Sequence, residues 1–395
     1  MSNFNSPRSA YIHIPFCRRR CFYCDFPISV VGDRPSHGTL GWMEEYSEFL
    51  CREINAAPKF QENLETVFFG GGTPSLLPIP LLEKILATLD SHLGIATGAE
   101  ISLEIDPGTF DLIQVQQYYH LGINRLSLGV QAFQDDLLKL SGRSHTTKDI
   151  FAAVEIVRQG GISNLSLDLI SGLPHQTPQH WQDSLQQAIN LAPEHLSCYD
   201  LVLEPVTAFG KQYQPGEKPL PEDETTANMY RQAQKILTQA GYKHYEISNY
   251  ARQGYQCRHN QVYWENRPYY GFGMGAASYV NQKRFNRPRT RAEYYDWVEK
   301  GAVIDSSLLD WEDVLLEKLM LGLRLAEGVS LGEIKEEFGE EIVEKIFVCL
   351  EPYFQKGWVD FCAGKTGHLR LTDPEGFLFS NTVLADLFLC TGQKK

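Results

Sequence analysis

Three cysteines near the start of the sequence, Cys17, Cys21 and Cys24, have a spacing that suits a metal cluster. They directly follow a short apolar run of the kind that forms a β-strand. A cubane 4Fe-4S cluster normally takes four thiolates, so a loop that supplies three leaves one iron open to a ligand or substrate. Zinc also favours thiolates, with His13 as the nearby fourth ligand, but His13 lies inside the predicted strand. Unrelated cysteines are a further alternative, and the softness and number of the ligands favour the cluster.

The elements that must position this loop follow one another in a regular alternation of strands and helices. Strands are predicted at residues 10–14, 66–69, 100–105, 125–130, 164–170 and 195–203, from short β-branched runs. Helices are predicted at residues 42–56, 81–93, 111–121, 147–159 and 179–191, from amphipathic periodicity. Such alternation implies a parallel sheet with right-handed crossovers. The six units suit an α/β fold, a partial (β/α)6 barrel.

Glycines and polar side chains come at the carboxyl ends of these strands, where parallel sheets bind ligands. A glycine run at residues 70–75 follows the second strand, Glu104 closes the third and Gln131 follows the fourth. Asp168 lies near the end of the fifth. A tight turn alone would explain the glycines, and a solvated charge or a helix cap would explain a carboxylate. The other interpretation is a polyfunctional ligand, whose hydroxyl or ammonium groups bind the acids and whose carboxylate pairs with Arg143.

The CxxxCxxC spacing, with Tyr23 before the last cysteine, resembles the radical S-adenosylmethionine (SAM) superfamily. The resemblance implies that the amino and carboxylate groups of SAM chelate the open iron. It also implies that an electron from the cluster cleaves SAM to a 5'-deoxyadenosyl radical. In that context, the backbone of the glycine run would approach the methionyl amino group of SAM.

Five segments extend the resemblance over nearly the whole chain, to the oxygen-independent coproporphyrinogen III oxidase family. They are residues 11–17, 70–75, 104–109, 124–131 and 166–174. By that likeness, Tyr11, Gly71 and Glu104 map to positions that contact the cluster-bound SAM. The positions that hold a second SAM in the oxidase map to Tyr23, Gly72, Thr73, Gln131, Arg143 and Asp168.

Phe26 distinguishes two branches of this family. The oxidase has a further cysteine at that position and a longer segment before its first strand. The ending Cys24-Asp25-Phe26 is instead similar to the HemW branch, regarded as haem chaperones. The likeness therefore argues against oxidase activity.

An HNxxYW motif that begins at His259 also resembles the HemW branch, where the motif is associated with haem binding. An imidazole can ligate haem iron, and the rings of Tyr263 and Trp264 can cover a flat porphyrin. Cys257 is a lesser candidate ligand, since haem also accepts a thiolate. The alternative is a histidine that is hydrogen-bonded within an aromatic core.

Charge and composition restrict the partners. The net charge of −13 argues against nucleic acid, because phosphate binding needs an excess of Lys and Arg. No apolar run predicts a transmembrane segment, and the start has no secretion signal. Six further cysteines are scattered and indicate reduced thiols, so we expect a cytoplasmic protein. The run from Arg18 to Arg20 is either a set of solvated charges beside an anionic cluster or a docking patch for a flavodoxin- or ferredoxin-like electron donor.

Two domains are expected, a barrel over residues 1–300 and a C-terminal domain over 301–395. Surface loops are predicted at residues 205–221 and 284–291. The C-terminal domain is predicted to have helices at 311–325, 331–338 and 340–356, then strands at 358–361 and 368–371 around a turn at Gly364. This order resembles a winged-helix-like α+β domain. From Ser306 onward 16 acidic residues oppose 9 basic ones, so DNA binding is not expected.

These features predict a haem chaperone that carries a 4Fe-4S cluster and SAM, binds haem and transfers it to an acceptor protein. The alternative is a radical SAM oxidase that decarboxylates the propionates of coproporphyrinogen III to vinyl groups. A third hypothesis, a plain electron-transfer protein, leaves the polar residues at the strand ends unexplained.

Overall fold

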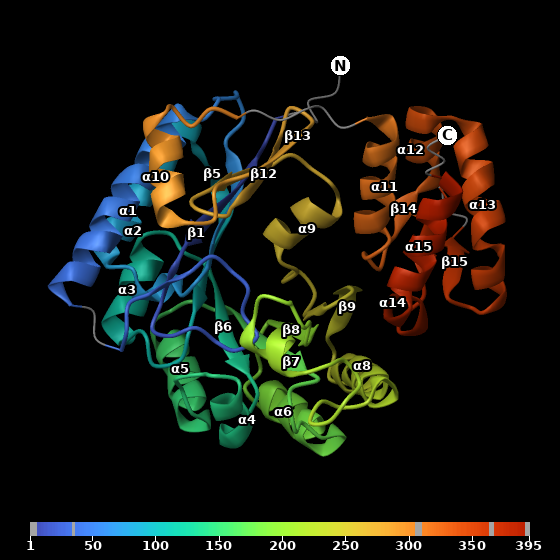
Figure 1. The fold of residues 1–395 in the computed structure, drawn as a ribbon, viewed down its shortest axis with the longest axis horizontal. Helices are drawn as coiled ribbons and strands as arrows, with labels where there is room; N and C mark the ends of the chain where they lie inside the picture. Colours follow the sequence, from blue (N-terminus) through green and yellow to red (C-terminus); the bar gives the residue numbers. More distant parts are fainter. Residues whose placement is uncertain (1–5, 34–35, 305–309, 363–366, 392–395) are drawn as a thin grey trace. The chain divides into compact units, whose positions relative to one another are not determined.

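The computed structural model of the chain describes residues 6–33, 36–304, 310–362 and 367–391 (Figure 1). The chain divides into two units, each with its own internal packing. The first contains residues 1–229 and 268–307, and the second contains residues 230–267 and 308–395. The second unit thus includes the segment 230–267 together with the C-terminal part of the chain. The domain boundary at residue 300 stays a prediction.

Seven parallel strands form the sheet of the first unit. In spatial order they are β11 (Tyr270–Phe272), β1 (Ser9–Ile14), β4 (Leu64–Gly71), β5 (Ile95–Ile105), β6 (Arg125–Gln131), β7 (Asn164–Ser171) and β8 (His195–Asp200). Six of them confirm the predicted strands, whose β-branched and apolar residues are buried as expected for a parallel sheet. Three residues are too few to show a strand pattern, so β11 is not predicted from the sequence.

Helices connect successive strands and cover one side of this sheet (Figure 1). They are α1 (His37–Ala56), α2 (Ile79–Leu93), α3 (Leu112–His120), α4 (Asp135–Leu140), α5 (Thr147–Gln159) and α6 (Pro178–Asn190). Ser36, Asp111 and Thr177 cap three of them by accepting a hydrogen bond from a first-turn N–H. The five predicted helices are confirmed, and the partial barrel follows from their alternation with the strands.

Shorter elements complete the first unit. They are β2 (Phe16–Cys17), β3 (Ser29–Val30), the 3-10 helix η1 (Pro74–Leu76), α7 (Ala208–Gln212), β12 (Ala277–Val280), β13 (Lys283–Asn286) and α10 (Arg291–Glu299). The helix α8 (Asp223–Gln239) begins in the first unit and ends in the second.

The prediction that residues 284–291 form a surface loop is wrong for the strand residues 284–286 and for Arg287, whereas residues 288–290 do form a loop in which Arg289 and Thr290 are exposed. β12 and β13 pair as an antiparallel hairpin, and Arg287 directly follows it with only 4% of its side chain exposed. Arg287 Nε lies 2.7 Å from Glu53 Oε1, and Glu53 is itself 2% exposed. Tyr294 and the Gly273 N–H also donate hydrogen bonds to this carboxylate. The arginine is buried because Glu53, from a distant helix, supplies the opposite charge.

The second unit combines a hairpin and a short helix from the middle of the chain with the C-terminal elements. The first group is β9 (Lys243–Glu246), β10 (Asn249–Ala251) and α9 (Arg258–Trp264). The second is α11 (Trp311–Gly322), β14 (Val329–Ser330), α12 (Leu331–Phe338), α13 (Glu340–Gln355), β15 (Val359–Cys362), β16 (His368–Leu371), α14 (Glu375–Leu378) and α15 (Ser380–Thr391).

The C-terminal elements confirm the predicted winged-helix-like order of three helices and a strand pair. β14 adds a third strand, so that β14, β16 and β15 form an antiparallel sheet. Leu319, Ile346 and Leu369 are fully buried in the core that these elements share. The predicted turn at Gly364 lies outside the described residues. In the part of the chain that the structure describes, no helix combines the length and apolar character that crossing a membrane requires.

The buried pair of Arg287 and Glu53 gives a test of this fold. Replacing Arg287 with methionine leaves a carboxylate in the core without its cation, which is expected to lower the free energy of unfolding by about 3–5 kcal/mol. Urea unfolding followed by circular dichroism measures the change. The exposed pair of Lys300 and Asp296 supplies the control, because Lys300→Met removes a solvated charge and is expected to change the transition little. Equal losses in the two variants would contradict burial as the cause.

Candidate functional site

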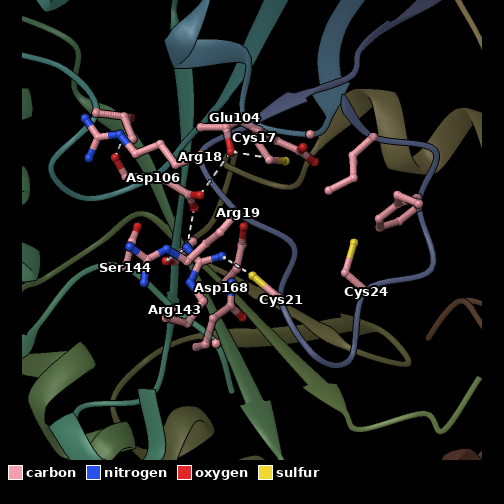
Figure 2. Close-up of a pocket in the computed structure, with 18 of the residues that line it drawn as sticks. Cys17, Arg18, Arg19, Cys21, Cys24, Glu104, Asp106, Arg143, Ser144 and Asp168 are labelled. Carbon is pink, nitrogen blue, oxygen red and sulfur yellow. Dashed lines mark hydrogen bonds and ion pairs between the residues drawn. The ribbon is translucent and has the colours of Figure 1, made fainter. Parts of the chain in front are cut away.

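A cavity of about 420 Å³ lies at the carboxyl ends of the strands in the first unit (Figure 2). Its wall combines the cysteine loop after β1 and the glycine run after β4 with the ends of β5, β6, β7 and β8. Parallel strands bring their carboxyl ends to one edge of the sheet, so segments far apart in the sequence meet there. The volume is in the range of cavities that hold a small organic ligand.

The cysteine loop is held against the sheet through two of its sulfur atoms. Cys17 is buried at the end of β2, and the Thr73 hydroxyl lies 3.7 Å from its Sγ. Arg143 Nη1 lies 3.5 Å from Cys21 Sγ, as Figure 2 shows. Cys21 and Cys24 are half-buried, and the Cys24 N–H donates to the Cys21 carbonyl across 3.2 Å. All three thiols therefore belong to one ordered loop at the wall of the cavity.

His13, the alternative zinc ligand, is engaged elsewhere. Its Nε2 lies 2.8 Å from the Pro27 carbonyl and its Nδ1 lies 3.1 Å from the Tyr11 hydroxyl. Burial lowers the pKa of His13 to about 4, so the imidazole is neutral. Both ring nitrogens have protein partners. Among the described residues, no three His, Cys, Asp or Glu side chains converge on a position for a single ion.

Two carboxyl groups face the cavity from β5 and β7, with β6 between them, and no hydrogen bond or ion pair among the described residues joins either one to a cation. Glu104 at the end of β5 accepts a hydrogen bond from the Gly71 N–H across 3.0 Å. Burial, together with the nearby Asp168, raises the pKa of Glu104 to about 8. Asp168 of β7 accepts from the Ser127 hydroxyl at 2.9 Å and from Ser166 at 3.2 Å, and burial raises its pKa. Both groups can accept hydrogen bonds from a ligand.

Arg143 and Asp106 form an ion pair between two parts of the wall. Asp106 also accepts a hydrogen bond from the Thr73 hydroxyl across 3.1 Å. Arg143 Nη2 donates to the Gly129 carbonyl across 2.9 Å. Its buried Nε has no hydrogen-bond partner within the described chain, so one donor is left for a ligand.

The glycines after β4 allow the cysteine loop to approach the strand. Gly71 has a φ of +110°, and a Cβ there would lie 2.4 Å from the His13 ring. A Cβ on Gly72 would lie 2.8 Å from the backbone carbonyl oxygens of Ile14 and Phe16. These glycines thus have a packing role, independent of any ligand.

Gln131 sits in a strained backbone conformation at the cavity. Its φ of +68° lies in the left-handed region that favours glycine, and the β6–β7 register shifts at this point. Such irregularities re-aim a side chain and are frequent beside functional sites.

The three cysteines and nearly all of the residues predicted to bind SAM line this cavity. They are Cys17, Cys21, Cys24, Tyr23, Gly71, Gly72, Thr73, Glu104, Gln131, Arg143 and Asp168. Tyr11 is not among the lining residues, because its ring packs beside Gly70 and Phe68. Their roles as ligands stay predictions.

Three further lining residues, Asp106, Ser127 and Tyr199, have no role in the sequence analysis. Asp106 is two residues after Glu104, so the alternation of a strand would have placed both side chains on one face. Tyr199 is the last residue but one of β8, so it also lies at the carboxyl end of a parallel strand, where ligands bind. Ser127 gives no such signal, because its position depends on the pairing of β5 with β6.

His259, the residue predicted to ligate haem, belongs to the second unit. It lies in α9 and is 1% exposed. Its Nε2 is 2.8 Å from the hydroxyl of Tyr263, one helical turn later, and the two rings meet edge to face. In the structure, His259 is thus hydrogen-bonded beside an aromatic ring, which is the predicted alternative to a free haem ligand. Cys257, the lesser candidate ligand, is fully buried.

Comparison with known proteins agrees with this architecture. Residues 11–188 match the model of the radical SAM superfamily, and residues 309–379 match that of the HemN C-terminal domain. The solved coproporphyrinogen III oxidase (HemN) from Escherichia coli is similar with a TM-score of 0.81. The likeness covers 97% of this chain and 90% of that chain, at 23% sequence identity. The partial radical SAM barrel with a C-terminal domain is therefore confirmed.

Three relatives match along most of their length. The chain is 52% identical to the heme chaperone HemW of Synechocystis sp., over 97% of this chain and 96% of the relative. The heme chaperone HemW of Bacillus subtilis is 37% identical over 89% of this chain and 92% of its own. That of Escherichia coli is 34% identical over 97% of this chain and 98% of its own. The chain belongs to the HemW family of the radical SAM superfamily.

Proposed function

We propose that this protein is a haem chaperone, which binds haem and transfers it to an acceptor protein. The observation that carries the proposal is the 52% identity, over 97% of the chain, to a relative named heme chaperone HemW. Phe26 supports it, because the oxidase resemblance would require a cysteine where this apolar ring lines the cavity, 55% exposed. Coproporphyrinogen oxidation is the less favoured alternative.

Membership of the radical SAM superfamily implies a 4Fe-4S cluster and SAM. We propose that Cys17, Cys21 and Cys24 hold the cluster, since three soft donors on one loop match its needs and leave an iron open. When bound and reduced, the cluster would supply an electron to SAM. Burial raises the pKa of the Cys17 thiol to about 12, so a bound metal is needed to keep it a thiolate at neutral pH.

The cavity has acceptors and a donor that suit the polar groups of SAM. Glu104 would accept a hydrogen bond from the amino group, and Asp168, oriented by serine hydroxyls, would accept from the ribose. The buried Arg143 Nε has no hydrogen-bond partner among the described residues, and it would donate to the carboxylate of SAM. The remaining proposed contacts to SAM are those of Tyr23, Gly71, Gly72, Thr73 and Gln131. The ring of Tyr11 packs beside Gly70, next to this group.

The haem site and the partners are proposed on narrower grounds. His259 is the proposed axial ligand, which requires that its imidazole leave the Tyr263 hydroxyl. We propose a flavodoxin- or ferredoxin-like donor at the run from Arg18 to Arg20, in which Arg19 and Arg20 are exposed and Arg18 is half-buried. Arg20 donates to the carbonyls of Cys24 and Phe26, so this run also fixes the shape of the cluster loop. We propose a cytoplasmic location, supported by nine free thiols that an oxidising compartment would tend to pair.

The cluster proposal predicts that Cys21→Ala reduces the iron content of the anaerobically reconstituted protein at least tenfold. Two thiolates cannot retain a cubane cluster. Iron analysis and visible absorbance measure the loss. Cys362→Ala, a half-buried cysteine in the second unit, is the matched control and should keep full iron. In the reduced wild type, SAM is expected to change the electron paramagnetic resonance spectrum, and an unchanged spectrum would refute the open iron.

The raised pKa of Glu104 predicts how SAM affinity depends on pH. Glu104 is protonated below pH 8 in the ligand-free protein, and an acceptor carboxylate must lose that proton when SAM binds. We expect affinity to fall as pH decreases from 8 to 6, by at most about tenfold per pH unit. Isothermal titration of the Glu104→Gln variant should show weaker binding with a flatter pH profile. A variant that keeps the wild-type slope would show that another group titrates.

The haem chaperone proposal predicts tight haem binding without porphyrin turnover. Absorbance titration with haem and an anaerobic assay for protoporphyrinogen are run on the same cluster-loaded preparation. Formation of protoporphyrinogen would refute the chaperone assignment in favour of the oxidase.

Two substitutions in α9 test the axial ligand. His259→Ala is expected to weaken haem binding at least tenfold and to change the Soret spectrum, because the imidazole is lost. Tyr263→Phe removes the competing hydroxyl and is expected to keep or increase the affinity. Circular dichroism checks that both variants fold. Wild-type affinity and spectrum in His259→Ala would remove His259 from the site.

A further inference from the structure

Two cysteines of the second unit, Cys349 and Cys390, lie on helices that pack against each other. Cys349 belongs to α13 and Cys390 to α15, 41 positions later in the chain. The sequence gives no sign of the pairing, since the spacing fits no disulfide framework or metal motif. The helices α13 and α15 pack against each other, and a side-chain hydrogen bond joins Cys349 to Cys390.

A neighbouring contact fixes the register of the two helices. Tyr353 of α13 donates a hydrogen bond to Asp386 of α15. Cys349 lies one helical turn before Tyr353, and Cys390 lies one turn after Asp386. On antiparallel helices these positions form the next layer along the same contact, so the two thiols face each other. The buried Ile346, Leu350 and Leu387 hold the helices together beside them.

The chemical environment of the two thiols agrees with this placement. Cys349 is half-buried, and burial together with the interaction of its thiol with Cys390 raises its pKa to about 12. Cys390 is exposed, so a reagent in solvent reaches it first. One accessible thiol beside one sheltered thiol is the arrangement of an attacking and a resolving cysteine.

We propose that Cys349 and Cys390 form a reversible disulfide and make the C-terminal unit a site of redox modification. The oxidant is a low-molecular-weight disulfide such as oxidised glutathione. The Cys390 thiolate attacks one of its sulfur atoms, which forms a mixed disulfide and releases one thiol. With Cys390 in the mixed disulfide, the negative charge of its thiolate no longer opposes ionisation of Cys349, which loses its proton to solvent. The Cys349 thiolate then attacks Cys390 Sγ and releases the second thiol. The protein pair loses two electrons and two protons, and the small disulfide gains them.

The bond would join α13 to α15 at the surface of the second unit, beside its core. It closes a loop of about 40 residues, which constrains the unfolded chain and favours the folded unit. A small-molecule thiol in excess reverses the reaction, so the state of the pair follows the thiol–disulfide balance around the protein. This proposal does not depend on the haem chaperone assignment.

The test uses the full-length, cluster-loaded protein under anaerobic conditions. The protein is incubated with oxidised glutathione at pH 8, free thiols are alkylated, and disulfide-linked peptides are mapped by mass spectrometry. We expect a Cys349–Cys390 peptide pair in most molecules, its removal by reduced glutathione, and a higher midpoint of urea unfolding for the linked form. Cys349→Ser should stop the reaction at a stable glutathione adduct on Cys390.

Cys362 provides the matched control within the same unit. It is half-buried, and its Sγ lies 3.9 Å from an Asp360 carboxylate oxygen. Cys362→Ser should leave the Cys349–Cys390 link unchanged. The proposal is overturned if wild-type protein accumulates the glutathione adduct on Cys390 without the internal link. It is equally overturned if either cysteine pairs with a different thiol while the far-ultraviolet circular dichroism stays native.

Discussion

The ion pair between Asp106 and Arg143 connects the parts of the cavity wall, because each partner also binds another segment. Asp106 directly follows β5 and accepts a hydrogen bond from the Thr73 hydroxyl, after β4. Arg143 donates to the Gly129 carbonyl of β6 and lies beside Cys21 of the cluster loop. The arginine side chain is 8% exposed, so it would be poorly hydrated without its carboxylate. The position of the cysteine loop relative to the sheet therefore depends on this pair.

The rest of the cavity has a marked division of charge. Glu104 and Asp168 form an acidic part whose pKa values are raised by burial, and their hydrogen bonds and the charge of Arg125 offset that rise only in part. The basic part is Arg143 with the half-buried Arg18 and the exposed Arg19 on the loop. A ligand with a positive and a negative end would pair its positive group with the acidic part and its negative group with the basic part. This polarity gives the cavity an orientation that a purely apolar pocket of the same size would lack.

Local periodicity was enough to predict six of the seven parallel strands and five of the six helices from α1 to α6, and the strand-end rule predicted the cavity. α12 and β16 agree with the predicted ranges residue for residue, because their apolar spacing is regular. The buried pair of Arg287 and Glu53 was out of reach, since the two residues are 234 positions apart and each resembles a surface charge when considered alone. The role of Ser127 depends on strand register, which a single sequence does not encode locally.

The hydrogen bond between His259 and Tyr263 has a consequence for any cargo that the histidine carries. In the proposed haem site, an arriving iron atom would compete with the Tyr263 hydroxyl, so the observed affinity would be the intrinsic affinity multiplied by the fraction of imidazole that is open. The same phenol is present when the cargo leaves and can return to the imidazole at once. If His259 holds haem as proposed, Tyr263 would thus weaken retention and ease release, and a carrier that must deliver its haem needs both.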